Sequence, residues 1–104
     1  MLGLGKWKFT VSTRFYSGTA FLVIGEKDGE YDVHAELANG KRPDFRFSKL
    51  QALGNTLTGV AQHSMLQGNT IPFSATFDED GTASGSLDVP FVGMIRFTNA
   101  EKVG

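Results

Sequence analysis

The sequence contains no cysteine, which excludes disulfide bonds, thiolate catalysis and thiolate metal ligands. Long hydrophobic runs are also missing, because the longest, Ala20 to Ile24, is far shorter than the ~20 residues of a transmembrane helix. The first residues lack the apolar core of a secretory signal. We therefore expect a soluble, cytoplasmic protein without a membrane partner.

The chain has no excess of charge of either sign. Ten Lys and Arg residues oppose eleven Asp and Glu residues, which leaves a formal net charge of -1. The densest basic stretch, residues 41–49, is interrupted by Asp44, and arginines do not alternate with aromatic residues on one exposed face. Proteins that bind nucleic acids usually carry such features, so we expect no nucleic-acid partner.

Cofactor and metal motifs are missing too. The glycines stand singly at turns, and none opens a helix as a phosphate-binding loop would require. The two histidines, His34 and His63, have no partner residues at metal-ligand spacing. The sequence therefore predicts neither a cofactor nor a metal site.

Apolar residues alternate with a period of two between closely spaced turn residues, which is typical of short strands. Asp28-Gly29 and Asn39-Gly40 are the strongest hairpin signals. No stretch keeps a helical period over three turns, although residues 48–54 fit either a single helical turn or a continued strand. We expect strands at 4–13, 19–26, 30–38, 56–63, 82–89 and 93–100, and two more around Phe45–Phe47 and Ile71–Phe77.

These strands predict an all-β fold with a single domain over residues 1–104. Short turns pair each strand with its sequence neighbour, and closure of the sheet removes both unpaired edges. We therefore expect an antiparallel up-and-down β-barrel of seven or eight short strands, with a two-sheet β-sandwich as the alternative. Large and small residues are mixed on the inward faces, which suits a narrow barrel that fills part of its interior.

Gly5-Lys6-Trp7 on the first strand resembles the Gly-x-Trp motif of the calycin group, which includes lipocalins, fatty-acid-binding proteins and avidins. In that group a basic side chain from near the end of the barrel packs across the tryptophan, and the resemblance assigns this role to Arg96. The chain is short and has no lipocalin cysteines or C-terminal helix. The resemblance therefore implies a compact, avidin-like or other small calycin-like barrel.

Aromatic residues on the inward faces are candidates for the walls of a ligand pocket. Such pockets are mostly apolar with a few polar groups, and Arg96 could supply one through its planar guanidinium. Two of the candidates also fit structural roles: Trp7 as a plug at the closed end, and Arg96 as a cation–π partner of Trp7. The ligand-binding candidates are Trp7, Phe9, Tyr31, Phe47, Phe73 and Arg96.

His63 is the candidate catalytic residue. It shares a strand face with Leu57, Gly59 and Ala61, and the small residues Gly59 and Ala61 leave room beside the imidazole. An imidazole titrates near neutral pH and can act as a general acid or base, although a histidine at a strand end can also be an exposed loop residue.

Three functions fit these observations. The first is a barrel that binds a small, mainly apolar molecule. The second is a small-molecule isomerase, cyclase or hydrolase that uses His63. The third is a packed barrel that serves as an assembly or accessory module.

The predicted strand 19–26 is apolar on both faces. Either Phe21 and Val23 or Leu22 and Ile24 must point out of the barrel. Exposed apolar patches mark interfaces, and most homo-oligomers are two-fold symmetric dimers. We therefore expect a homo-oligomer that forms through this strand.

Overall fold

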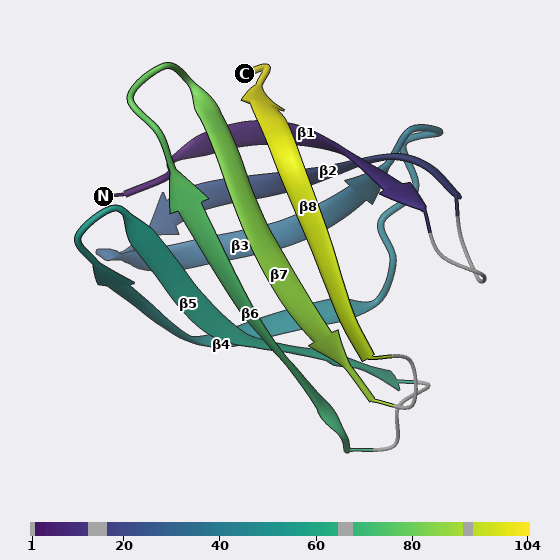
Figure 1. The fold of residues 1–104 in the computed structure, drawn as a ribbon. Coiled ribbons are helices and arrows are strands. Elements are labelled where there is room, and N and C mark those ends of the chain that lie inside the picture. Colours follow the sequence, from purple (N-terminus) through teal and green to yellow (C-terminus); the bar gives the residue numbers. More distant parts are fainter. Residues whose placement is uncertain (1, 13–16, 65–67, 91–92) are drawn as a thin grey trace.

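The computed structural model describes residues 2–12, 17–64, 68–90 and 93–104, and its regular structure consists of antiparallel strands (Figure 1). Within these residues no helix is long and apolar enough to cross a membrane. The strands are β1 (Gly5–Ser12), β2 (Ser17–Lys27), β3 (Glu30–Leu37), β4 (Phe45–Leu53), β5 (Thr56–His63), β6 (Thr70–Phe77), β7 (Thr82–Val89) and β8 (Gly93–Lys102).

The eight strands form one sheet in the order β3-β2-β1-β8-β7-β6-β5-β4. Each strand pairs with its sequence neighbour except β3 and β4, and β1 pairs with β8, the first strand with the last. β1 to β3 cross the direction of β6 to β8 as the sheet curls round (Figure 1). β3 and β4 are the two edges of the sheet, and in the described part of the chain no ladder joins them. The barrel is therefore nearly closed, with its opening between these two strands. The prediction of an up-and-down barrel is confirmed.

The contact between β1 and β8 continues into the C-terminal residues. Trp7 lies opposite Lys102 in the ladder. The Val103 amide donates a hydrogen bond to the Lys6 carbonyl oxygen at 2.7 Å, and the Lys6 amide donates to the Gly104 carbonyl oxygen at 3.1 Å. These bonds give β1 a hydrogen-bonded neighbour on each side.

One end of the barrel is filled by a hydrophobic core. This is the end where β2, β4, β6 and β8 finish, and Trp7, Ile24, Leu57 and Phe77 are its largest buried members. Leu57 is 1% exposed and Ile24 is 2% exposed. Burial of each such side chain stabilises a protein by about 1.5–3 kcal/mol, so this end supplies a large share of the folding free energy.

The N-terminal segment Leu2–Leu4 covers this closed end. The Trp7 indole Nε1 donates a hydrogen bond to the Gly3 carbonyl oxygen at 2.8 Å, and the Tyr31 hydroxyl donates to the Leu2 carbonyl oxygen at 3.0 Å. Gly3 has a φ of 79°, and a Cβ atom there would lie 2.6 Å from the Phe77 ring. Only glycine lets the segment pass so close to the core.

Residues 48–53 continue β4 rather than forming a helical turn, and Gly54 lies in the turn that follows. The pairing of β4 with β5 shifts between Ser48 and Gln51, and Lys49 has a φ of 54°. A bulge changes which residues face inward. Leu50 lies within the bulge and packs against the core, whereas Leu53 is 83% exposed.

β2 has Ala20 and Ile24 buried on its inner face, so Phe21 and Val23 lie on the outer face. Both outer side chains are partly buried. The Lys6 ammonium group lies 4.6 Å from the centroid of the Phe21 ring and covers part of it.

Candidate functional site

The interior is hollow at the end where β1, β3, β5 and β7 finish. A cavity of about 470 Å³ lies there, above the core of the closed end. Apart from Glu36 and His63, every residue that lines it is apolar. The lining residues are Trp7, Phe9, Ala20, Leu22, Ala35, Glu36, Leu37, Pro43, Phe45, Phe47, Ala61, His63, Ile71, Phe73, Ala75, Phe77, Ala83, Leu87, Val89, Ile95, Phe97 and Ala100.

Trp7 separates the cavity from the core. It belongs to both sets of residues, and its side chain is 6% exposed. Its ring centroid lies 4.8 Å from that of Phe77, and its Nε1 donates a hydrogen bond to the Gly3 carbonyl oxygen on the side of the closed end. The indole is therefore held from below and forms part of the cavity floor.

The cavity walls depend on paired aromatic rings. Phe47 and Phe73 meet edge to face at 5.7 Å, with an interplanar angle of 87°, and Phe9 and Phe97 lie 5.4 Å apart. Edge-to-face pairs stabilise by about 0.5–1.5 kcal/mol beyond their burial. Phe9 and Phe97 come from the adjacent strands β1 and β8, and Phe47 and Phe73 come from the two strands that flank β5, so each pair packs side by side along one stretch of wall.

Two glycines on the inner face make room for these rings. A Cβ on Gly59 would lie 2.9 Å from the Phe73 ring, and a Cβ on Gly85 would lie 2.7 Å from Phe97 and collide with the Ser74 carbonyl oxygen. Atoms of real side chains do not come so close. The rings therefore lie directly over backbone at these two positions.

His63 lies at the mouth of the cavity. It is directly opposite Phe45 in the β4–β5 ladder, and the two rings meet edge to face at 4.9 Å. Phe45 and His63 both line the apolar cavity. His63 also lines a second, polar pocket on the outside of the barrel.

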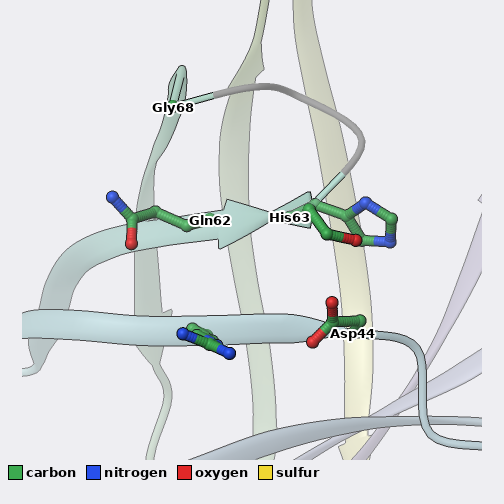
Figure 2. A pocket seen from close by; sticks show the side chains of 6 residues that line it. Asp44, Gln62, His63 and Gly68 are labelled. Atoms are coloured by element: carbon green, nitrogen blue, oxygen red, sulfur yellow. The ribbon is translucent and has the colours of Figure 1, made fainter.

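This outer pocket has a volume of about 250 Å³ and is lined by Asp44, Arg46, Gln62, His63, Ser64 and Gly68 (Figure 2). Arg46 and Gln62 are direct neighbours on β4 and β5, and both are exposed. Asp44 precedes β4 and lies at the same end of the pocket as His63 (Figure 2). The polar side chains of the outer pocket thus lie next to the mouth of the apolar cavity, with His63 between them.

Glu36 is the other polar residue beside the cavity, and three cationic or basic groups surround its carboxylate. The Lys6 Nζ lies 3.2 Å away, the His34 Nε2 2.9 Å and an Arg42 nitrogen 3.6 Å. The hydrogen bonds from His34 and from Lys6 lower the pKa of Glu36 below its usual value. This cluster ties the connection after β3 to β1. Within the described ranges no group of three His, Asp or Glu residues could hold a metal ion.

The structure brings most of the predicted site residues together. Trp7, Phe9, Phe47, Phe73 and His63 all line the cavity. Residues that the sequence interpretation missed also line it, such as Phe45, Leu87 and Ile95. Phe45 could have been found from its spacing of two residues from Phe47.

Tyr31 and Arg96, which the sequence interpretation placed in the ligand site, are not among the residues that line the cavity. Tyr31 faces the interior, but at the closed end, where its hydroxyl binds the N-terminal segment. Arg96 lies between Ile95 and Phe97, which both line the cavity, so it points outward and is exposed. The residue of β8 opposite Trp7 is Lys102 rather than Arg96.

The polar pocket was not predicted from the sequence. It depends on the register that sets Arg46 beside Gln62 and on the connection that carries Asp44 back toward β5. The sequence shows the charged residues at 41–49, but it does not indicate which strand pairs with this stretch. Such a site requires the three-dimensional arrangement.

The nearly closed antiparallel barrel is compatible with a calycin-like fold. The Gly-x-Trp tryptophan lies near the closed end, while the arginine that the resemblance assigned to it lies outside the barrel. Comparisons with protein-family models, with curated proteins and with solved structures find no match to this chain.

Proposed function

We propose that this chain is a small calycin-like binding barrel whose cavity takes a small, mainly apolar molecule. The cavity itself supports this proposal most directly. Its volume of about 470 Å³ is typical of small-molecule sites, and its lining is almost entirely carbon. An apolar molecule that moves from water into such a site gains roughly 25 cal/mol for each Å² of surface removed from water.

The cavity volume limits the size of the ligand. If each non-hydrogen atom takes the ~30 Å³ of a water molecule in the liquid, the cavity holds about 15 such atoms. A medium-length alkyl chain or two fused rings fit this limit. A long-chain lipid does not.

A panel of apolar molecules of graded size tests the proposal. A ligand that binds only the folded state at 100 times its Kd stabilises that state by about 2.7 kcal/mol. We expect compounds of about 8 to 15 non-hydrogen atoms to raise the unfolding midpoint and to change the fluorescence of Trp7, because Trp7 lines the cavity. If no compound of this size raises the midpoint, the proposal is wrong.

A matched pair of variants locates the binding site. Ala61 is 3% exposed and lines the cavity, so Ala61→Phe fills part of the space. Thr58 lies on the same strand and is exposed, so Thr58→Phe adds the same ring outside the barrel. We expect Ala61→Phe to remove the ligand-induced stabilisation and Thr58→Phe to keep it. Overpacking costs about 1–3 kcal/mol, so the comparison uses the shift caused by ligand in each variant.

A second candidate function uses the same cavity for acid–base chemistry. The observation that favours it is the position of His63, which borders both the apolar cavity and the polar pocket that contains Asp44. A substrate held in the cavity would place its reactive group beside this imidazole. His63→Ala distinguishes the two functions: a binding barrel shows no turnover before or after the change, whereas an enzyme loses turnover and keeps its fold.

The packed-barrel alternative gains no support from the structure. An accessory module without a ligand has no need for a hollow interior, and close packing would make it more stable. The interior instead contains alanines at positions such as Ala20, Ala35 and Ala61, where larger side chains could fill the space.

A further inference from the structure

We infer that the ligand is an amphiphile with an uncharged polar head, whose apolar body occupies the barrel cavity and whose head group occupies the outer pocket beside His63. This inference rests on the proposed binding function and specifies its ligand class. The carrying observation is that one residue, His63, lines both an apolar cavity and a polar pocket.

The two spaces meet at His63, which Phe45 contacts from the cavity side. Phe45 and His63 lie opposite each other and in ring contact at 4.9 Å. Apart from Glu36 and His63 itself, the lining of the cavity is apolar. On the outer side Asp44, Arg46 and Gln62 replace it. A ligand that extends past His63 therefore has apolar side chains around its inner part and hydrogen-bonding side chains around its outer part.

The charges of the outer pocket favour a neutral head group. Arg46 and Asp44 carry opposite charges, so the pocket has no net charge from them. A carboxylate head would be attracted by the Arg46 guanidinium but repelled by the Asp44 carboxylate. An ammonium head would be attracted by Asp44 and repelled by Arg46. A hydroxyl or primary amide accepts a hydrogen bond from Arg46 or Gln62 and donates one to Asp44.

Three side chains of the outer pocket, those of Asp44, Arg46 and Gln62, are available for such a head group. Among the described residues, no other side chain forms an ion pair with Asp44 or Arg46. Arg46, Gln62 and Asp44 are exposed, so they exchange water for the ligand without breaking internal contacts. Each new hydrogen bond at a wet site contributes modestly to affinity.

Three probes with the same ten-carbon alkyl chain test the inference: 1-decanol, undecanoate and decylammonium. Their alkyl chains fit within the cavity, so differences in affinity report the head group. We expect 1-decanol to bind at least threefold more tightly than either ion, as measured by titration of Trp7 fluorescence and by the shift in unfolding midpoint. An equal or tighter affinity for undecanoate or decylammonium overturns the inference.

Paired variants test the place of the head group. Arg46→Ala/Gln62→Ala removes donors from the outer pocket, and both residues are exposed, so the fold is retained. Arg96→Ala/Gln51→Ala is the matched control, because it removes an exposed arginine and an exposed glutamine that do not line either space. We expect the first pair to weaken 1-decanol binding about three- to tenfold, equivalent to one or two net hydrogen bonds, and the control pair to leave it unchanged.

The outcomes separate this inference from the proposed function. If all three probes bind equally and the outer-pocket variant has no effect, the cavity binds apolar chains but the head-group assignment is wrong. If no probe binds while other apolar compounds do, the amphiphile assignment is also wrong. If no apolar compound binds at all, the proposed function falls and this inference falls with it.

Discussion

Replacement of Trp7 tests the arrangement of the closed end and the cavity floor together. The indole is 6% exposed, its ring lies 4.8 Å from that of Phe77, and its Nε1 bonds the Gly3 carbonyl oxygen at 2.8 Å. Replacement of a buried Trp by Ala costs about 3–5 kcal/mol. We expect Trp7→Ala to lie toward the upper part of this range, because it also leaves the Gly3 carbonyl without its donor.

Trp7→Phe separates the two contributions. A phenyl ring keeps the contact with Phe77 but cannot donate to Gly3, so the variant loses one hydrogen bond and part of the buried area. A net hydrogen bond contributes about 0.5–1.5 kcal/mol, and we expect a total loss of about 1–3 kcal/mol once the smaller ring is included. The ordering of wild type, Phe and Ala is therefore the central expectation.

Urea unfolding followed by far-ultraviolet circular dichroism measures these differences without relying on the tryptophan that is removed. Lys8→Ala is the control, because Lys8 is an exposed neighbour on the same strand and its removal should change stability by about 0.5 kcal/mol or less. The wild-type tryptophan should emit at short wavelength and resist quenching by iodide. A loss below about 1 kcal/mol for Trp7→Ala would show that the indole does not support the closed end.

Three further predictions concern Gly85 in the cavity wall, the charged cluster around Glu36, and assembly. Gly85→Ala should destabilise the fold by more than about 2 kcal/mol in urea unfolding, because its Cβ collides with the Ser74 carbonyl oxygen. The hydrogen bond from His34 lowers the pKa of Glu36 in the folded protein below its ordinary value of 4.5. The ionised carboxylate therefore stabilises the fold at pH values above 4.5, and this stabilisation is lost as the pH falls through the lowered pKa of the folded protein. The stability difference between wild type and Glu36→Gln should therefore be present at pH 7 and vanish in acid. A homo-oligomer through strand 19–26 remains a prediction: light scattering at micromolar concentration should show at least a dimer, and Phe21→Ser should shift it toward monomer.

Each of these predictions has a control or a contradicting result. Gly40→Ala meets no atom within 4 Å and, at a φ of 84°, measures the backbone strain alone, so a loss at Gly85 no larger than at Gly40 removes the packing explanation. Glu26→Gln is the control for Glu36→Gln, because it removes an exposed carboxylate that forms no ion pair with a described residue. A wild-type monomer at micromolar concentration rules out the interface.

The alternation of apolar residues was sufficient to predict the strands and the barrel. The hairpin expected at Asp28-Gly29 is present, because β2 pairs with β3 on either side of it. The hairpin expected at Asn39-Gly40 was wrong: the chain turns there, but among the described residues β3 and β4 do not pair. The bulges were not predictable. One on β4 turns Leu50 inward, and another lies where β8 passes Gly85, so that Phe97 and Ala100 both face inward although they are three residues apart.

Alternation also says nothing about position along the barrel axis. It placed Tyr31 and Phe9 on inward faces alike, but Tyr31 lies at the closed end and Phe9 at the cavity. The difference is made by Leu2–Leu4, which crosses the closed end and binds the Tyr31 hydroxyl. In sequence this segment resembles the start of the first strand, and only the tertiary structure shows that it is a plug.

The small inward residues carry more information about function than the aromatic ones. Aromatic side chains such as Phe77 and Trp7 fill the closed end, where they stabilise the barrel. At the open end the rings of Phe73 and Phe97 lie close to glycines, and alanines on β2, β3 and β5 line the cavity, which keeps the space between the walls empty. Larger side chains there would bury more apolar surface and increase stability. The chain instead combines a packed floor with a hollow above it, an arrangement that stabilises the fold less than a filled barrel would and that a ligand can complete.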